Sequence, residues 1–280
     1  MTGWGDDQGL PPEYFEAGTA SFVDFLRVHA PESLPVNRVP REDSAALDLP
    51  HGTTVLALTF PGGVMMAGDR RATRGHQIAY RELEKVQRAD DHSVVAFAGT
   101  VGLALEMVRL FQVELEHYEK METVPLSLPG KARRLGAVVQ ANLAQAMQGL
   151  AVVPLFAGYD PDAGEGKIYT YDITGSPQEA RDFHAEGSGS PYATGALKKL
   201  YRRDLSLEDA ATVCVHALYD AADDDSATGG PDRARGLYPV VSVVTGDGYR
   251  RLPEAQVAGI AEAVVEGRHT RPGGPLAPLR

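Results

Sequence analysis

Apolar and polar positions in the first part of the body of the chain follow a pattern typical of short β-strands. Runs of β-branched and apolar residues are interrupted by turn-forming residues, such as Pro61-Gly62-Gly63 and Asp90-Asp91. Short apolar runs bounded by such turns predict strands joined in hairpin succession. The predicted strands are Thr53–Phe60, Val64–Ala67, Glu84–Arg88 and Ser93–Ala98.

The period of the pattern then changes to that of helices. Leu103, Met107 and Leu110 recur at spacings of three and four, which places them on one face of a helix. Strands and helices alternate in groups over the rest of the chain. The predicted helices are about Val101–Met121, Gly130–Gln148, Tyr192–Arg202, Leu207–Asp223 and Pro253–Glu266, and the predicted strands are Val153–Tyr159, Lys167–Asp172, Arg181–Glu186 and Val240–Thr245.

The order of these elements indicates a fold class. Strands follow strands and helices follow helices, which favours α+β layers over a winding of alternating strands and helices. Two antiparallel sheets packed face to face, with helix pairs on both outer sides, satisfy this order. We therefore predict a four-layer αββα sandwich.

The two ends of the chain differ from its body. Residues 1–52 contain six prolines, nine acidic and three basic residues, and little periodicity, so we expect an extended leader with a net charge of −6. Within it, Phe22–Leu26 has the pattern of a short amphipathic helix. The tail from about Gly267 is rich in proline and glycine and is predicted to be loose. Residues 53–280 are expected to form one domain.

Composition and charge narrow the function classes. Hydrophobic residues make up 43% and charged residues 23% of the chain, as in ordinary globular proteins. A net charge of −11 argues against nucleic acid or an anionic membrane as a partner. The chain starts without basic residues and holds a single cysteine, Cys214, so we expect a cytoplasmic protein with no internal disulfide. The histidines show no zinc spacing and no phosphate loop is present, so we expect no metal and no cofactor.

Three residues in the predicted hairpins have the character of a catalytic set. Asp69 lies sixteen residues after Thr53, and Lys85 lies sixteen residues after Asp69. Consecutive hairpin strands return to the same end of a sheet, so this spacing can bring the three side chains together. Taken alone, Asp69 would be interpreted as a solvated turn residue and Lys85 as an exposed strand residue. Their regular spacing relative to Gly52-Thr53 and Gly99 favours the catalytic interpretation instead.

The chemistry of these residues fits a threonine nucleophile. A threonine hydroxyl needs a base to take its proton, and the α-amine of Thr53 can be that base if the chain begins there. A free α-amine has a pKa of about 7.7–8.0. A lysine ammonium at position 85 would lower the pKa of that amine, and Asp69 would hold the ammonium charged and oriented. The N–H of Gly99 could stabilise the oxyanion.

The glycine directly before Thr53 favours Thr53 over Thr54 as the nucleophile. Thr54 is the rival nucleophile, but successive side chains on a strand point to opposite faces, so only one of the two threonines can face the site. To release the amine, the Thr53 hydroxyl must attack the carbonyl of Gly52. That attack needs a tight turn, which glycine permits. We therefore predict cleavage between Gly52 and Thr53.

The same residues resemble those of a known family. The run GTTVLALTFPGGVMMAGDRRATRG, the lysine thirty-two residues after the threonine, and Ala98-Gly99-Thr100 are similar to proteasome β subunits. The run LYDAADDDSATGG is similar to the actinobacterial branch. The resemblance covers about residues 51–266 and implies the fold of the N-terminal nucleophile (Ntn) hydrolases. It also implies a threonine-type endopeptidase of the ATP-dependent degradation system, made as a zymogen whose propeptide, residues 1–52, is removed by autocatalytic cleavage.

The resemblance also assigns roles. Thr53, Asp69, Lys85 and Gly99 match catalytic positions of the family, Ser188 matches its serine near the threonine amine, and Asp225 matches the aspartate bonded to that network. Thr228 stands where many relatives have serine. The substrate-binding positions implied are Ala72, Thr73, Leu83, Gln87, Phe97, Val101 and Leu105. None of these is charged and most are apolar, which predicts a preference for large apolar residues before the scissile bond.

Partners follow from the resemblance as well. It implies β subunits in seven-membered rings and proteasome α subunits, arranged as four stacked α-β-β-α rings. A ring-shaped ATPase and tagged protein substrates are implied too. Two alternatives compete: another Ntn hydrolase, such as a small-molecule amidase or a simpler bacterial protease ring, and a non-catalytic scaffold subunit. Amidases lack the Asp69 and Lys85 register, subunits of the simpler ring lack so long a leader, and scaffold subunits lose catalytic residues that this chain keeps.

Overall fold

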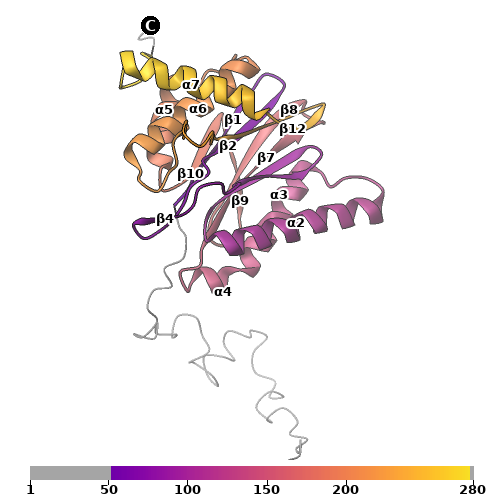
Figure 1. Cartoon of the computed structure of the whole chain (residues 1–280). Helices are drawn as coiled ribbons and strands as arrows, with labels where there is room; N and C mark the ends of the chain where they lie inside the picture. Colours follow the sequence, from indigo (N-terminus) through magenta and orange to yellow (C-terminus); the bar gives the residue numbers. More distant parts are fainter. Residues whose placement is uncertain (1–51, 278–280) are drawn as a thin grey trace, which may run out of the picture. The chain divides into compact units, whose positions relative to one another are not determined.

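The computed structural model describes residues 52–277, and the fold is built from two five-stranded sheets (Figure 1). The predicted helix at Phe22–Leu26 and the rest of the leader up to His51 lie outside the described residues. All pairings within the two sheets are antiparallel. The first sheet has the order β10-β1-β2-β11-β12, formed by Phe183–Gly187, Thr54–Phe60, Gly63–Gly68, Val240–Thr245 and Gly248–Arg251.

The second sheet faces the first. Its order is β5-β6-β7-β8-β9, formed by Val86–Asp90, Ser93–Gly99, Val152–Asp160, Glu165–Tyr171 and Pro177–Ala180. Between β2 and β5 the chain forms a separate two-stranded hairpin, β3 (Ala72–Arg74) and β4 (Gln77–Tyr80). This hairpin leaves the sheets next to the end of β2 and leads the chain from the first sheet to the second.

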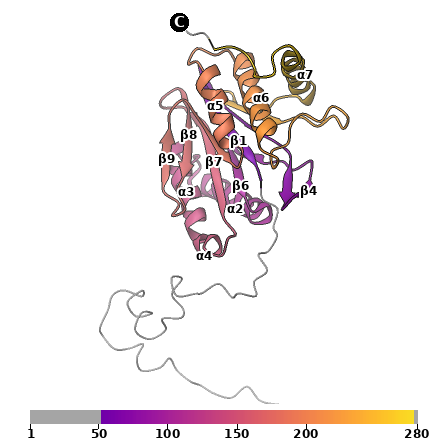
Figure 2. The same cartoon turned by 90° about the vertical axis from the view of Figure 1, so that its left-hand side faces the viewer.

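Helices cover both outer faces of the sheet pair, as the two views show (Figures 1 and 2). One layer packs on the first sheet, and the other packs on the second sheet. The first layer consists of α5 (Ser190–Leu200), α6 (Leu207–Asp224) and α7 (Glu254–Thr270), and the second contains α2 (Val101–Glu122), α3 (Leu128–Ala141) and the short α4 (Leu143–Ala146). The predicted four-layer α+β sandwich is confirmed.

Burial on both faces explains why the central strands read as continuous apolar runs. In β1, Val55 and Ala57 point into the core between the sheets, whereas Leu56 and Leu58 pack under α5 and α6. The third core lies between the second sheet and α2 and α3, where Phe111 contacts the edge of Phe156. Cys214 is fully buried in the first helix layer, and that burial raises the pKa of its thiol.

Several predicted elements differ in detail from the structure. The predicted helix Gly130–Gln148 is divided at Asn142, whose side-chain amide donates to the Val138 carbonyl and ends α3. The predicted strand Arg181–Glu186 is interrupted at Asp182, which has a φ of 60° and carries the chain from β9 in one sheet to β10 in the other. Strands β3, β4, β9 and β12 were not predicted, because they are short and most of their residues are exposed or only half-buried.

The end of the chain is more ordered than its composition indicated. Helix α7 continues to Thr270, past the predicted end at Glu266. The Arg268 guanidinium is nearly buried, stacks on the Tyr219 ring and donates to the Pro272 carbonyl. These contacts hold the first part of the predicted loose tail against the helix layer.

Candidate active site

Thr53 lies at the point where the chain enters β1, and its surroundings are closely packed. The Thr53 residue is only 2% exposed. Its hydroxyl donates to the carbonyl oxygen of Gly52 at 2.6 Å. Gly52 has a φ of 105°, and a Cβ there would lie 2.5 Å from the Cβ of Ala227. Both the backbone angle and the space therefore require glycine at this junction.

Asp69 and Lys85 form an ion pair that spans the two sheets. Asp69 follows β2 of the first sheet, whereas Lys85 precedes β5 of the second sheet. Their charged groups are 2.6 Å apart, and both side chains are completely buried. The Lys85 ammonium also donates to the Gly52 carbonyl oxygen at 3.4 Å. The predicted convergence of the three side chains is present, but it occurs between facing sheets and not at one end of a single sheet.

The Asp69 carboxylate is held by backbone donors as well as by Lys85. The N–H of Thr54 donates to Oδ1 at 2.8 Å, and the N–H groups of Arg71 and Gly229 donate to Oδ2 at 2.9 and 2.8 Å. With Lys85 the carboxylate thus accepts four hydrogen bonds from four segments of chain. A carboxylate held this way has a fixed position, and it fixes the ammonium in turn.

Burial sets the protonation behaviour of Lys85. Removal from water lowers the pKa of the Lys85 ammonium below its ordinary value of 10.5, and the neighbouring Asp69 carboxylate opposes this shift. The net direction is downward, so the dry surroundings outweigh the ion pair. Asp69 therefore offsets only part of the effect by which burial disfavours the charged form of Lys85.

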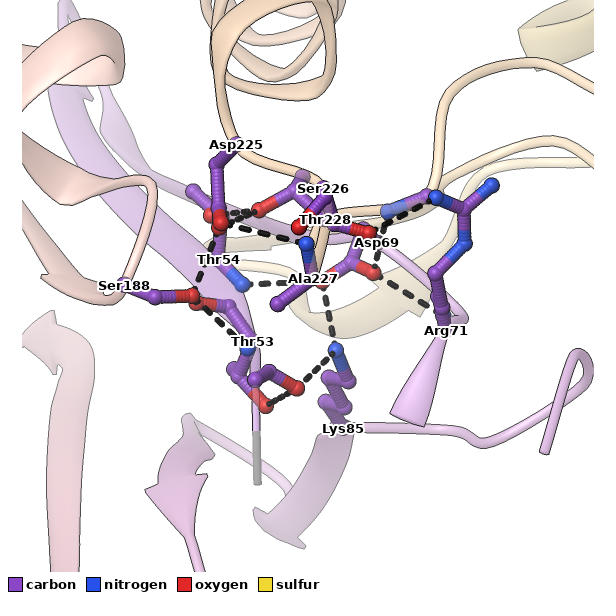
Figure 3. A network of polar contacts seen from close by, with 12 residues as sticks. Thr53, Thr54, Asp69, Arg71, Lys85, Ser188, Asp225, Ser226, Ala227 and Thr228 are labelled. Atoms are coloured by element: carbon purple, nitrogen blue, oxygen red, sulfur yellow. Dashed lines mark hydrogen bonds and ion pairs between the residues drawn. The ribbon is translucent and has the colours of Figure 1, made fainter. Parts of the chain in front are cut away.

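A second network reaches the backbone nitrogen of Thr53 (Figure 3). The N–H of Thr53 donates to Ser188 Oγ at 3.4 Å, and Ser188 donates to Asp225 Oδ2 at 2.6 Å. The Thr228 hydroxyl donates to the same carboxylate oxygen at 2.6 Å, and it lies 2.6 Å from the hydroxyl of Thr54. The structure thus brings Ser188 and Asp225, both expected from the resemblance, to the nitrogen that would become the free amine.

Two glycines allow backbone segments to approach each other closely. Gly99 has a φ of 108°, and a Cβ there would lie 2.2 Å from the carbonyl oxygen of Ala151. Gly187 has a φ of 101°, and a Cβ there would lie 2.0 Å from the Thr53 carbonyl oxygen. The oxyanion role of the Gly99 N–H stays a prediction, because its geometry toward a substrate depends on the bound peptide.

The expected substrate-binding residues occupy several elements around the site. Ala72 and Thr73 lie on β3, Leu83 lies on the segment before β5, Gln87 lies on β5, Phe97 on β6, and Val101 and Leu105 one turn apart on α2. Phe97 is 1% exposed and packs in the core beneath α2, whereas Leu105 is 40% exposed. The Gln87 amide donates to the Glu84 carbonyl at 2.9 Å. Their role in substrate binding stays a prediction.

Some functional groups were missed by sequence reasoning. Thr54 appeared only as a rival nucleophile, yet its N–H binds Asp69 and its hydroxyl meets Thr228. The N–H groups of Arg71 and Gly229 were not predicted as ligands of Asp69, and backbone donors leave no signal in side-chain identity. Gly187 carried a weak signal, since it opens the Gly187–Ser190 turn.

Two structural features are absent from the residues that the structure describes. Within residues 52–277, no group of three or more histidine, cysteine, aspartate or glutamate side chains has the arrangement of a metal site. In the same range, no helix is long and apolar enough to cross a membrane.

Comparisons with known proteins identify relatives of this chain. The model of the proteasome subunit family matches residues 49–233. The chain is 68% identical to proteasome subunit beta 2 of Thermomonospora curvata, over 98% of each chain. It is 58% identical to proteasome subunit beta 1 of Streptomyces avermitilis, over 96% of this chain and 97% of the relative. It is 53% identical to proteasome subunit beta of Acidothermus cellulolyticus, over 100% of this chain and 98% of the relative.

Proposed function

Because this chain belongs to the proteasome subunit family, we propose that it is a catalytic β-type subunit of the proteasome core, an endopeptidase whose nucleophile is the hydroxyl of Thr53. One observation carries this proposal. The Thr53 hydroxyl and the Lys85 ammonium both donate to the carbonyl oxygen of Gly52, and Asp69 fixes that ammonium. A nucleophile, a polarised carbonyl and a buried charge therefore meet at the bond expected to break.

The first reaction is removal of the leader by the chain itself. Thr53 Oγ1 attacks the carbonyl carbon of Gly52, the bond between that carbon and the Thr53 nitrogen breaks, and the proton of the hydroxyl moves to the nitrogen. The resulting ester is hydrolysed by water, which leaves a carboxylate on Gly52 and a free hydroxyl and amine on Thr53. Lys85 stabilises the negative charge that develops on the Gly52 oxygen.

The second reaction is cleavage of a substrate peptide. The new α-amine of Thr53 takes the hydroxyl proton as the oxygen attacks the scissile carbonyl, and it later gives that proton to the leaving amine as the peptide bond breaks. Water then hydrolyses the ester left on Thr53 Oγ1, which releases the carboxylate product and restores the free hydroxyl. The positive charge of Lys85 lowers the pKa of the Thr53 amine and so keeps it an unprotonated base at neutral pH. Ser188, held by Asp225, lies at the nitrogen and orients it.

The competing functions fit the site less well. A non-catalytic scaffold subunit would not require a completely buried ion pair whose ammonium donates to a glycine carbonyl. A small-molecule amidase of the same class would lack the lysine and aspartate that here converge from two sheets. We therefore favour the protease over both.

Membership of the family supports a proposal for assembly and location. We propose that the chain works in the cytoplasm, in seven-membered β rings stacked between rings of α subunits. A ring-shaped ATPase would deliver tagged proteins to the particle. Residues 1–52 are in this view a propeptide that keeps the enzyme a zymogen until its removal.

Specificity depends on the residues around β5, β6 and the start of α2. Phe97 is buried and no charged side chain is among the predicted pocket residues, so a charged substrate side chain would lose its hydration without gaining a partner. We expect cleavage after leucine, tyrosine or phenylalanine to exceed cleavage after lysine or glutamate. A panel of fluorogenic peptides varied at that position tests this on the assembled particle, and faster cleavage after arginine or glutamate would refute the pocket assignment.

The proposed nucleophile is tested by two substitutions at one position. Thr53→Ala removes the hydroxyl and is expected to abolish hydrolysis of a fluorogenic peptide. Thr53→Ser retains a hydroxyl and is expected to keep measurable activity, which controls for disturbance of the fold. Peptidase activity in purified Thr53→Ala particles would show that Thr53 is not the nucleophile.

A further inference from the structure

Three arginines gather beside the active site without a role in the chemistry described above. Arg70, Arg71 and Arg81 line a small cavity of about 30 Å³. Asp232 is the single acidic residue of its lining, and Arg235 pairs with that carboxylate at 2.8 Å. The cavity wall thus carries more positive than negative charge, and its size admits a carboxylate group.

These arginines, here called the arginine cluster, keep unused donors. Arg70 pairs with Glu254 at 3.3 Å and Glu84 at 3.9 Å, but its Nε is buried and has no hydrogen-bond partner within residues 52–277. Arg81 is exposed and has no ion-pair partner in that range. A buried donor without an acceptor is unfavourable, so an acceptor that reached Arg70 Nε would remove this cost.

The leader joins the described structure close to this cluster. Gly52 packs against Ala227, and the carbonyl of the preceding residue, Ser226, accepts a hydrogen bond from the Arg71 guanidinium at 3.0 Å. Gly52, the first residue that the structure describes, therefore lies one loop residue away from the Arg71 contact. Asp48 is four positions upstream, within about 14 Å of reach for an extended chain.

The leader has the charge and the pattern that suit this surface. It carries a net charge of −6, and Asp48 is flanked by Leu47 and Leu49. Arg81 also lines a neighbouring groove of about 510 Å³ along residues 78–83, where Ile78 is 36% and Tyr80 is 54% exposed. The sequence Leu47-Asp48-Leu49 therefore has the chemical character that would complement a surface joining an arginine to exposed apolar side chains.

We propose that the arginine cluster binds the acidic end of the leader, chiefly the Asp48 carboxylate, before the leader is removed. This contact anchors the chain on the far side of Gly52 and keeps the Gly52 carbonyl against the Thr53 hydroxyl. The inference rests on the proposed function in one respect, namely that residues 1–52 are a leader that is cut away. After removal the cluster no longer binds this carboxylate.

The experiment uses charge reversal and its repair in the full chain. In the Thr53→Ala background, the uncut leader is exposed to a glutamyl endopeptidase, and the rate of cutting after Glu42 is followed by mass. Arg81→Glu and Asp48→Lys are each expected to speed this cutting about threefold, as loss of an exposed ion pair would. The combination Arg81→Glu with Asp48→Lys restores the pair with reversed charges, and it is expected to return the rate toward its starting value. Arg250→Glu, an exposed arginine on β12, is the matched control.

The outcomes separate this inference from the proposed function. The same charge variants are also made with Thr53 intact, where each single reversal is expected to slow leader loss and the double reversal to restore it. If Thr53→Ala chains lose the leader unaided, the proposed function fails, and the variants with Thr53 intact still decide the inference. If single reversals change neither rate, or if their effects add in the double variant, the arginine cluster does not bind Asp48.

Discussion

Two polar networks meet at Thr53, and they differ in burial and in charge. The pair of Asp69 and Lys85 is completely buried, carries both charges and reaches the Gly52 carbonyl. The chain of Ser188, Asp225 and Thr228 approaches the Thr53 nitrogen from the other side, and Ser188 lies at the exposed surface. A buried charge acts strongly over a short distance, whereas a hydrogen bond near water acts weakly. We therefore propose that the first network supplies the electrostatics and that the second orients the nitrogen.

The largest effect is expected from the buried pair. Lys85→Ala and Asp69→Ala should each lower peptidase activity by about 10²–10⁴-fold, the range of a lost acid–base partner. Lys85→Arg should rescue poorly, because a planar guanidinium does not match the compact ammonium. Activity of purified particles on a fluorogenic peptide measures this, and near-normal turnover in any of the three would remove that residue from the mechanism.

Loss of one partner also costs stability, so a control must separate the two effects. Removing one member of a buried pair costs about 3–5 kcal/mol, because the other charge remains unpaired. The double variant Lys85→Met with Asp69→Asn leaves no net charge and should unfold at a higher temperature than either single alanine variant. It should nevertheless remain inactive, which assigns the loss of activity to chemistry.

The direction of the Lys85 pKa gives a pH prediction. Because burial lowers this pKa, the ammonium and the activity should be lost as pH rises, at a pH below the ordinary lysine value of 10.5. Asp69→Asn removes the influence that raises the pKa, so the alkaline limb of its residual activity should lie at still lower pH. A limb that stays in place in Asp69→Asn would mean that Lys85 does not control it.

The contribution of Lys85 to the free energy of unfolding should rise with pH, whereas the activity should fall. The lysine binds its proton less tightly when folded than when unfolded, so the unfolded chain binds more protons between the lowered pKa and 10.5. Stability then rises with pH in that window. The difference in unfolding free energy between wild type and Lys85→Met should therefore change in favour of wild type as pH increases, while wild-type activity falls.

A smaller effect is expected from the second network. Asp225→Ala and Ser188→Ala should each reduce kcat by about tenfold, which corresponds to about 1.4 kcal/mol, near the lower end of the range for a hydrogen bond to a charged group. Asp223→Ala, an exposed neighbour on α6, is the matched control and should leave kcat unchanged. A loss as large as that of Lys85→Ala would contradict the division between the two networks.

The smallest effect is expected at Thr228, which joins the second network to Thr54. Thr228→Ser keeps the hydroxyl and should leave activity and melting temperature nearly unchanged. Thr228→Val leaves the buried Thr54 hydroxyl without its partner and should cost about 1–3 kcal/mol of stability. Chemical denaturation measures both, and equal stability of the valine variant would show that this contact is neutral.

The sequence indicated the layers of the fold because its long elements bury continuous apolar faces. The strands around Val55 and Val94 and the helix with Met107 are of this kind, and all were expected. The short hairpin of β3 and β4 was not expected, since its residues are mostly exposed and its place depends on contacts outside its own pattern. Helix α3 ends at a single side-chain contact of Asn142, which periodicity does not register.

The candidate site was predictable where it depends on side-chain type and not where it depends on the backbone. The threonine, the aspartate and the lysine were expected from spacing and chemistry. That Lys85 comes from the opposite sheet was not, because hairpin succession alone does not reveal where the chain changes sheets. The N–H of Gly229 reaches Asp69 across 160 positions, a contact that only the folded chain reveals.

The mass and the N-terminal residue of the purified, assembled protein test the central claim most directly. The account predicts that the wild-type chain begins at Thr53 and has lost residues 1–52, while Thr53→Ala keeps the leader under the same conditions. An active wild-type particle that retains Gly52, or a Thr53→Ala chain cut at the same bond, would contradict it.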